Sequence, residues 1–177
     1  MHTLRRLLPV LALLVPTAAC QLHGDTPSSE SARREAAHVL DELHRLAAAA
    51  DGEAYFALFE PDASYLGTDA SERWSLEQFR AYAEPWFAQG RGWSYSVTER
   101  RLTVAEDGRT AWFDERLRNA KYGECRGSGV LVHGERGWRI AQYVLSLPVP
   151  NELALDLVQR IQALEASPSP AAGDGGL

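Results

Sequence analysis

The chain has 177 residues, of which 45% are hydrophobic and 24% are charged, and its formal net charge is −6. This length allows one domain with appendages, and the composition is ordinary for a globular protein with a sizeable core. The acidic balance and the lack of a basic patch argue against nucleic acid as a partner. The two cysteines, Cys20 and Cys125, and the five scattered histidines show no metal-ligand spacing, so we expect no metal and no bound cofactor.

Residues 1–19 are predicted to be an export signal. A basic start is followed by an apolar run that is too short to span a membrane in the mature protein, and then by small residues. The sequence TAAC, which ends at Cys20, resembles the lipobox of bacterial lipoproteins. The resemblance implies a lipid on Cys20 and a place in the cell envelope, at the outer membrane facing the periplasm where the cell has one. Without that lipid the protein would be periplasmic or secreted.

Residues 20–29 are polar and contain glycine and proline, which indicates a flexible tether. Apolar residues then recur every three or four positions from about residue 30 to residue 50, as in an amphipathic helix. Asp51-Gly52 ends this helix, and a short second helix is predicted over 53–59.

A turn at 60–62 and a short strand at 63–66 follow in the prediction. Ser75 is placed to cap a third helix that runs to about residue 89. Pro85 lies inside this helix and is expected to kink or divide it.

The segment 92–147 is rich in aromatic and β-branched residues between turn signals at 107–108, 122–123 and 134–137. This pattern predicts an antiparallel meander of long strands. Prolines end the last strand, and a final amphipathic helix is expected over 151–165. The composition of residues 166–177 is typical of a disordered tail.

Three segments resemble the SnoaL-like branch of the nuclear transport factor 2-like superfamily: ADGEAYFALFEPDASYLGTDASERW, AWFDE and GWRIAQYVLS. The resemblance covers about residues 30–165. It implies an α+β fold, in which a cone-shaped, curved antiparallel sheet (a cystatin-like roll) of about four long strands plus a short one packs on three N-terminal helices, with a C-terminal helix. It also implies a ligand pocket inside the cone, and a homodimer, because dimers are common among members.

Strand alternation places Glu115 on the same face as Phe113 and Leu117, which should point toward the helices. A carboxyl group among apolar side chains has a raised pKa, which suits proton transfer near neutral pH. Glu115 is therefore a candidate catalytic residue, with Asp114 as the candidate if the two faces are inverted. The alternative is a structural ion pair between Glu115 and Arg126 or Arg80.

The candidate pocket-lining residues are aromatic or polar and lie at strand ends, on strand faces or in the 67–74 loop. They are Tyr65, Asp69, Trp74, Tyr95, Phe113, Tyr122, Arg126 and Gln142. The simpler interpretation of the aromatic residues is core packing, and that of Asp69 is local turn hydrogen bonding. Gln142 occupies a position where many family members have an inward-facing histidine, so histidine chemistry is absent at that point.

Three functions remain open from the sequence. The first is an exported, lipid-anchored protein that binds a small, largely apolar ligand of unknown identity in the cone pocket. The second is an enzyme of the isomerase, cyclase or hydrolase kind that moves a proton on a small carbonyl-containing substrate. Its base would be Glu115 or Asp114, with Tyr65 or Tyr122 polarising the oxygen. The third is an envelope module that dimerises through the outer face of its sheet.

Overall fold

The computed structural model describes residues 29–167. Export signal, Cys20, most of the tether and the last ten residues fall outside that range. The helices are α1 (Ser29–Ala49), α2 (Gly52–Phe56), α3 (Leu76–Phe87) and α4 (Asn151–Glu165). The strands are β1 (Phe59–Leu66), β2 (Arg73–Ser75), β3 (Ser96–Val104), β4 (Thr110–Asn119), β5 (Gly123–Gly134) and β6 (Gly137–Ser146).

The six strands form one curved sheet in the order β2-β1-β6-β5-β4-β3. The predicted meander is confirmed, because β3 to β6 pair antiparallel in succession. The sheet as a whole is mixed, because β1 lies parallel to β6 and joins the meander to β2. The α+β class with a curved, unclosed sheet is confirmed.

Strand β1 begins at Phe59, so the segment 60–62 is part of a strand and not the predicted turn. Its register against β6 shifts between Phe59 and Ser64. Pro61 lies inside this irregular stretch and has no N–H to give to the neighbouring strand. A proline therefore marks a break in the pairing here and not the end of the strand.

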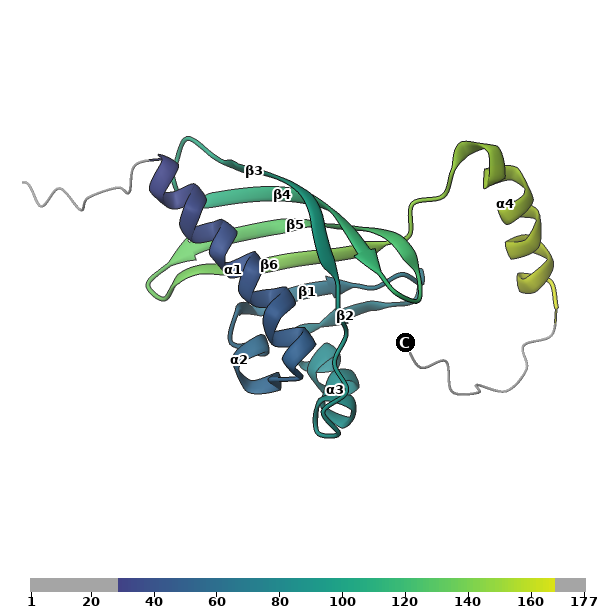
Figure 1. The fold of residues 1–177 in the computed structure, drawn as a ribbon, viewed down its shortest axis with the longest axis horizontal. Coiled ribbons are helices and arrows are strands. Elements are labelled where there is room, and N and C mark those ends of the chain that lie inside the picture. Colours follow the sequence, from purple (N-terminus) through teal and green to yellow (C-terminus); the bar gives the residue numbers. More distant parts are fainter. Residues whose placement is uncertain (1–28, 168–177) are drawn as a thin grey trace, which may run out of the picture.

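The three N-terminal helices pack against one face of the sheet, with α1 lying across it (Figure 1). The side chain of Asp51 accepts from the N–H of Ala54 and caps α2. Ser75 and Gln78 form a capping box that starts α3. Helix α3 continues through Pro85 without a division, because the proline lies in its last turn.

The face assignment for β4 is confirmed. Phe113, Glu115 and Leu117 are buried beneath the helices. The residues that alternate with them, Trp112, Asp114, Arg116 and Arg118, are exposed. Aromatic side chains from α2, α3 and β1 form another part of the core; they are Tyr55, Phe56, Phe59, Phe79 and Phe87. The helices therefore close the concave side of the sheet with apolar contacts.

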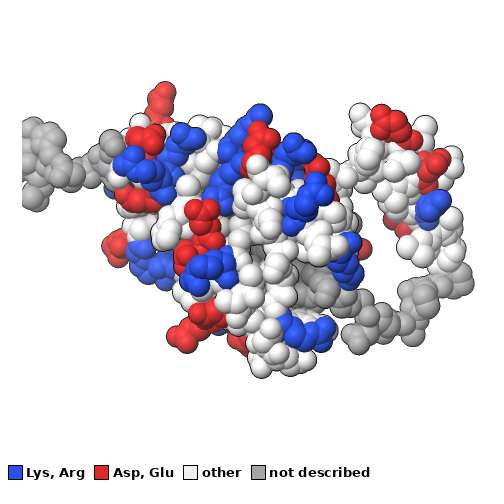
Figure 2. All heavy atoms as spheres, viewed as in Figure 1, with Lys and Arg blue, Asp and Glu red and all other residues white. Residues whose placement is uncertain are grey.

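Helix α4 is present where the sequence predicts it, but no residue of the helix is buried. The segment 147–150 carries it away from the sheet (Figure 1). Its apolar side chains are exposed, namely Leu153, Leu155, Leu157, Val158, Ile161 and Leu164. Within 29–167 no helix combines the length and the apolar character needed to cross a membrane. On the face seen in Figure 2, basic and acidic side chains are interspersed.

Candidate functional site

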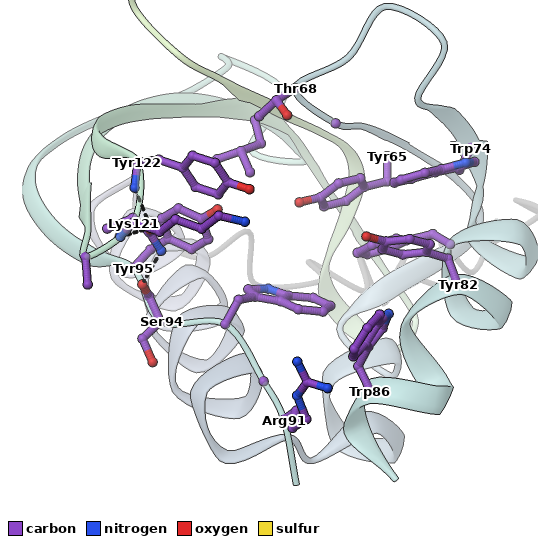
Figure 3. A pocket seen from close by; sticks show the side chains of 17 residues that line it. Tyr65, Thr68, Trp74, Tyr82, Trp86, Arg91, Ser94, Tyr95, Lys121 and Tyr122 are labelled. Carbon is purple, nitrogen blue, oxygen red and sulfur yellow. Dashed lines mark hydrogen bonds between the residues drawn. The ribbon is translucent and has the colours of Figure 1, made fainter. Parts of the chain in front are cut away.

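An open cavity of about 280 Å³ lies where the ends of β1 and β6, helix α3, the segment 91–95 and the β4–β5 turn meet (Figure 3). This volume is close to the lower end of the range for small-molecule pockets, which is roughly 300–1,000 Å³. The lining residues are Tyr65, Gly67, Thr68, Trp74, Phe79, Tyr82, Trp86, Arg91, Gly92, Trp93, Ser94, Tyr95, Asn119, Ala120, Lys121, Tyr122 and Leu145. Eight of these are aromatic.

Part of the cavity wall consists of nearly parallel aromatic rings. Tyr65 and Phe79 stack with centroids 3.8 Å apart and an interplanar angle of 15°. Trp74 continues the layer, because its ring lies at 8° to Phe79 and at 23° to Tyr82. These stacked rings pack against one another and give this part of the wall an aromatic surface.

The β4–β5 turn is held against the segment 91–95 by Asn119. Its side-chain amide donates to the Ser94 carbonyl at 3.0 Å and accepts from the backbone N–H of Lys121 and Tyr122. These bonds hold Tyr122 and Lys121 in place in the lining of the cavity. Burial raises the pKa of Tyr95, which lies beside them, to about 12. Its hydroxyl is a hydrogen-bond donor at neutral pH, as that of any tyrosine is.

Glu115 lies outside this cavity, in a buried polar cluster under α1. Its carboxylate has no exposed surface, and both oxygens have partners. Oε1 lies 2.7 Å from His44 Nε2 and accepts from the Tyr143 hydroxyl at 3.2 Å, and Oε2 accepts from Arg100 Nε at 2.8 Å. We call these four residues the Glu115 cluster.

Arg100 ties the cluster to α1. Its Nη1 donates to the carbonyl of Ala37 at 3.2 Å and to the carboxylate of Asp41 at 2.7 Å. Gly127 faces Glu115 across the strands, and a side chain there would place its Cβ 2.9 Å from Glu115 Oε1. The cluster therefore needs a glycine at this position of β5.

The pKa of Glu115 is set by two opposing effects. Burial would raise it, but the hydrogen bond and charge of His44 and the charge of Arg100 outweigh burial and hold the pKa below its usual value. The expectation of a raised pKa is therefore wrong. The apolar neighbours of Glu115 lie on its own strand, whereas its cationic partners, His44 and Arg100, come from α1 and β3, which strand alternation does not reveal.

A small second void separates the Glu115 cluster from the main cavity. Its volume is about 10 Å³, which is close to the minimum space for one water molecule. His44 and Tyr143 line it from the cluster side, and Tyr65, Trp93 and Tyr95 line both cavities. The cluster thus lies behind the cavity wall.

Four of the eight predicted lining residues line the main cavity: Tyr65, Trp74, Tyr95 and Tyr122. The other four, Asp69, Phe113, Arg126 and Gln142, do not. Asp114, the second catalytic candidate, is exposed on the outer face of β4. No group of three or more His, Cys, Asp or Glu side chains is arranged to hold a metal ion among residues 29–167.

Local geometry explains the misplaced residues. Asp69 accepts hydrogen bonds from Ser71 in an exposed turn, and Phe113 packs in the core against Tyr143. Arg126 is exposed on the outer face, so it cannot pair with Glu115. For Gln142 the cause is a pairing irregularity between β5 and β6.

That irregularity changes which residues of β6 face the helices. Trp138 and Ile140 are buried, but after the register shift the buried positions are Tyr143 and Leu145. An extra residue in a strand reverses the alternation beyond it. The inward position is therefore occupied by Tyr143, a hydrogen-bond donor to Glu115, and not by Gln142.

The actual partners of Glu115 left a detectable signal in the sequence. His44 lies in the apolar stripe of α1, four residues after Leu40 and beside Leu43. Arg100 alternates with Leu102 on the inward face of β3 and stands directly opposite Glu115. A polar residue within an apolar face is a sign of a buried polar contact. The cavity residues Trp86, Arg91, Trp93 and Lys121 carried no such local signal.

Comparisons with known proteins agree with this architecture. The family model described as a SnoaL-like domain matches residues 36–150. A proposed dehydratase of the NTF2-like family from Streptomyces avermitilis is similar in structure, with a TM-score of 0.60 at 11% identity over 70% of this chain and 100% of that one.

An NTF2-like protein of unknown function from Pseudomonas putida gives a TM-score of 0.58 at 14% identity, over 70% of this chain and 92% of that one. A proposed aromatic ring hydroxylase from Novosphingobium aromaticivorans gives a TM-score of 0.57 at 17% identity, over 70% of this chain and 93% of that one. Comparison with the curated proteins gives no match. The structural likenesses establish a shared fold. The family match covers the whole sheet, helices α2 and α3, and all of α1 except its first turns. It shows that the chain belongs to the SnoaL-like domain family.

Proposed function

We propose that this is an exported protein, anchored to the cell envelope through a lipid on Cys20, whose SnoaL-like domain binds a small, largely apolar ligand. The observation that carries the binding proposal is the open, aromatic cavity of about 280 Å³ at one end of the concave sheet. A cavity with an apolar lining and a few polar groups is the usual form of a small-molecule site. Support for export comes from the first 20 residues, with their basic start, short apolar run and TAAC sequence.

The geometry favours binding over proton transfer by Glu115. Both oxygens of that carboxylate are engaged within the Glu115 cluster, and its pKa is lowered. None of the residues that line the main cavity is an aspartate, a glutamate or a histidine. A general base must come within hydrogen-bond reach of the proton it removes. The usual bases are therefore missing from the wall that a ligand would touch.

The binding proposal is tested with a neutral fluorescent aromatic compound, N-phenyl-1-naphthylamine, titrated into the purified full-length protein. We expect saturable binding, and we expect Thr68→Trp to weaken it at least tenfold because the larger side chain occupies the cavity. Thr103→Trp is the matched control, since Thr103 is exposed on β3 away from the cavity. Equal binding by both variants would contradict the proposal that this cavity is the site.

Anchoring is tested separately with Cys20→Ser in a bacterial host. A cysteine thiol is needed to carry the lipid, so we expect the variant to leave the membrane fraction while the unchanged protein stays in it. Equal membrane association of the two proteins would contradict the lipid anchor and leave the ligand site untouched.

A further inference from the structure

The charges at the main cavity have one sign only. Arg91 and Lys121 are among its lining residues, which include no acidic side chain. This contrasts with the whole chain, whose formal net charge is −6. Lys121 is also the only lysine in the sequence. A local excess of positive charge at a cavity attracts ligands of negative charge.

Neither Arg91 nor Lys121 forms an ion pair with an acidic side chain among residues 29–167. The ion pairs in that range are made by other residues. The Arg91 guanidinium lies over the ring of Trp86, 4.5 Å from its centroid, and the Lys121 ammonium lies 4.8 Å from that of Tyr122. Both contacts hold a cation against an aromatic wall without cancelling its charge. The two residues approach the cavity from different elements, one after α3 and one in the β4–β5 turn (Figure 3).

The neutral part of the wall is largely aromatic, which suits contact with the rings of an aromatic ligand. Four rings, those of Tyr65, Phe79, Trp74 and Tyr82, form the nearly parallel layer described above. A tyrosine hydroxyl is protonated at neutral pH and is able to donate to an anion, and burial holds the pKa of Tyr65 well above its usual value. Aromatic surface, phenol donors and cations therefore occur together in one cavity.

We infer that the ligand of this cavity is a small, planar aromatic molecule that carries a negative charge, such as an aromatic carboxylate. Its rings lie against the aromatic wall, and its anionic group lies at the mouth between Arg91 and Lys121. This inference rests on the proposed function, because it names the chemical class of ligand for the same cavity.

The test compares three naphthalene compounds of nearly equal size: 2-naphthoate is an anion, 2-naphthamide is neutral, and 2-naphthylmethylammonium is a cation. Dissociation constants are measured with the full-length protein by calorimetry at low salt. Two partly solvated cations each add a modest attraction, so we expect the anion to bind about tenfold more tightly than the amide and the cation to bind most weakly. The preference should shrink in 0.5 M salt, where screening is strong.

The decisive variant is the double substitution Arg91→Gln with Lys121→Gln. We expect the double variant to bind naphthoate no more tightly than naphthamide. Its affinity for naphthamide should stay within about twofold of that of the unchanged protein. Retained binding of the neutral compound shows that the variant is folded and its cavity intact. The matched control is Arg33→Gln with Arg109→Gln, which removes the same net charge at two exposed positions outside the cavity and should keep the tenfold preference.

The outcomes separate this inference from the proposal on which it rests. If the anion and the amide bind equally, or if the double variant keeps the preference, the inferred preference for an anionic ligand is wrong. The proposal that the cavity binds an apolar ligand is then unaffected. If none of the three compounds binds, the ligand-binding function itself is contradicted. As an independent readout, saturating naphthoate should slow modification of Lys121 by an amine-reactive reagent several-fold, and an unchanged rate would place the anion elsewhere.

Discussion

The concave side of the sheet contains two regions that use charged and aromatic side chains in opposite ways. In the Glu115 cluster, every charge has a partner of opposite sign or a hydrogen-bond donor, and the carboxylate has no exposed surface. At the main cavity, the charged groups of Arg91 and Lys121 lie over aromatic rings, and neither group forms an ion pair with an acidic side chain among residues 29–167. The two regions are separated by a void of about 10 Å³.

This difference distinguishes a buried contact that maintains the fold from a surface that is ready to bind. Removing one member of a buried ion pair leaves the other charge uncompensated, which is costly. Removing a cation from an open cavity costs little stability, because water already solvates it, and changes recognition instead. Stability measurements can therefore test the assignment of each region.

The largest expected effect is that of Glu115→Gln. The substitution leaves Arg100 and His44 without their shared carboxylate, so the free energy of unfolding should fall by about 3 kcal/mol in urea denaturation. Asp114→Asn, at the exposed neighbouring position of the same strand, is the control and should change it by less than about 0.5 kcal/mol. Unchanged or raised stability of the Glu115 variant would mean that this carboxylate is kept for chemistry and not for the fold.

A smaller effect is expected from deleting one hydroxyl in each region. Tyr143→Phe removes the hydrogen bond to Glu115 and should lower the free energy of unfolding by about 1.5 kcal/mol, since the acceptor is charged and buried. Tyr65→Phe makes the same chemical change at the cavity. Within 29–167 the Tyr65 hydroxyl makes no hydrogen bond that would be lost, so the change should stay below about 0.5 kcal/mol. Equal losses in the two variants would erase the distinction between the regions.

Much of the architecture was predictable from local patterns. The helical spacing of α1, α3 and α4, the turns of the meander and the inward face of β4 all agree with the structure. The parallel pairing of β1 with β6 and the three-residue strand β2 were not predictable in this way. Pairing between strands far apart in the chain depends on how the whole sheet assembles, and a strand of three residues has almost no periodicity of its own.

The candidate site was predicted only in part, for the same reason. Tyr65, Trp74, Tyr95 and Tyr122 were selected as aromatic residues at strand ends and loops, and the structure brings them to one cavity. Gln142 was misplaced because the register shift in β6 reverses the alternation on which the prediction relied.

The sequence by itself determined the positions of the main helices, the meander and the apolar face of β4, because these depend on residues a few positions apart. Only the tertiary structure decided that Glu115 meets His44, Arg100 and Tyr143, and that Arg91 and Lys121 line the same cavity. Those contacts join residues distant in the chain, so they depend on strand register and on how the helices pack over the sheet. Local periodicity carries no information about either.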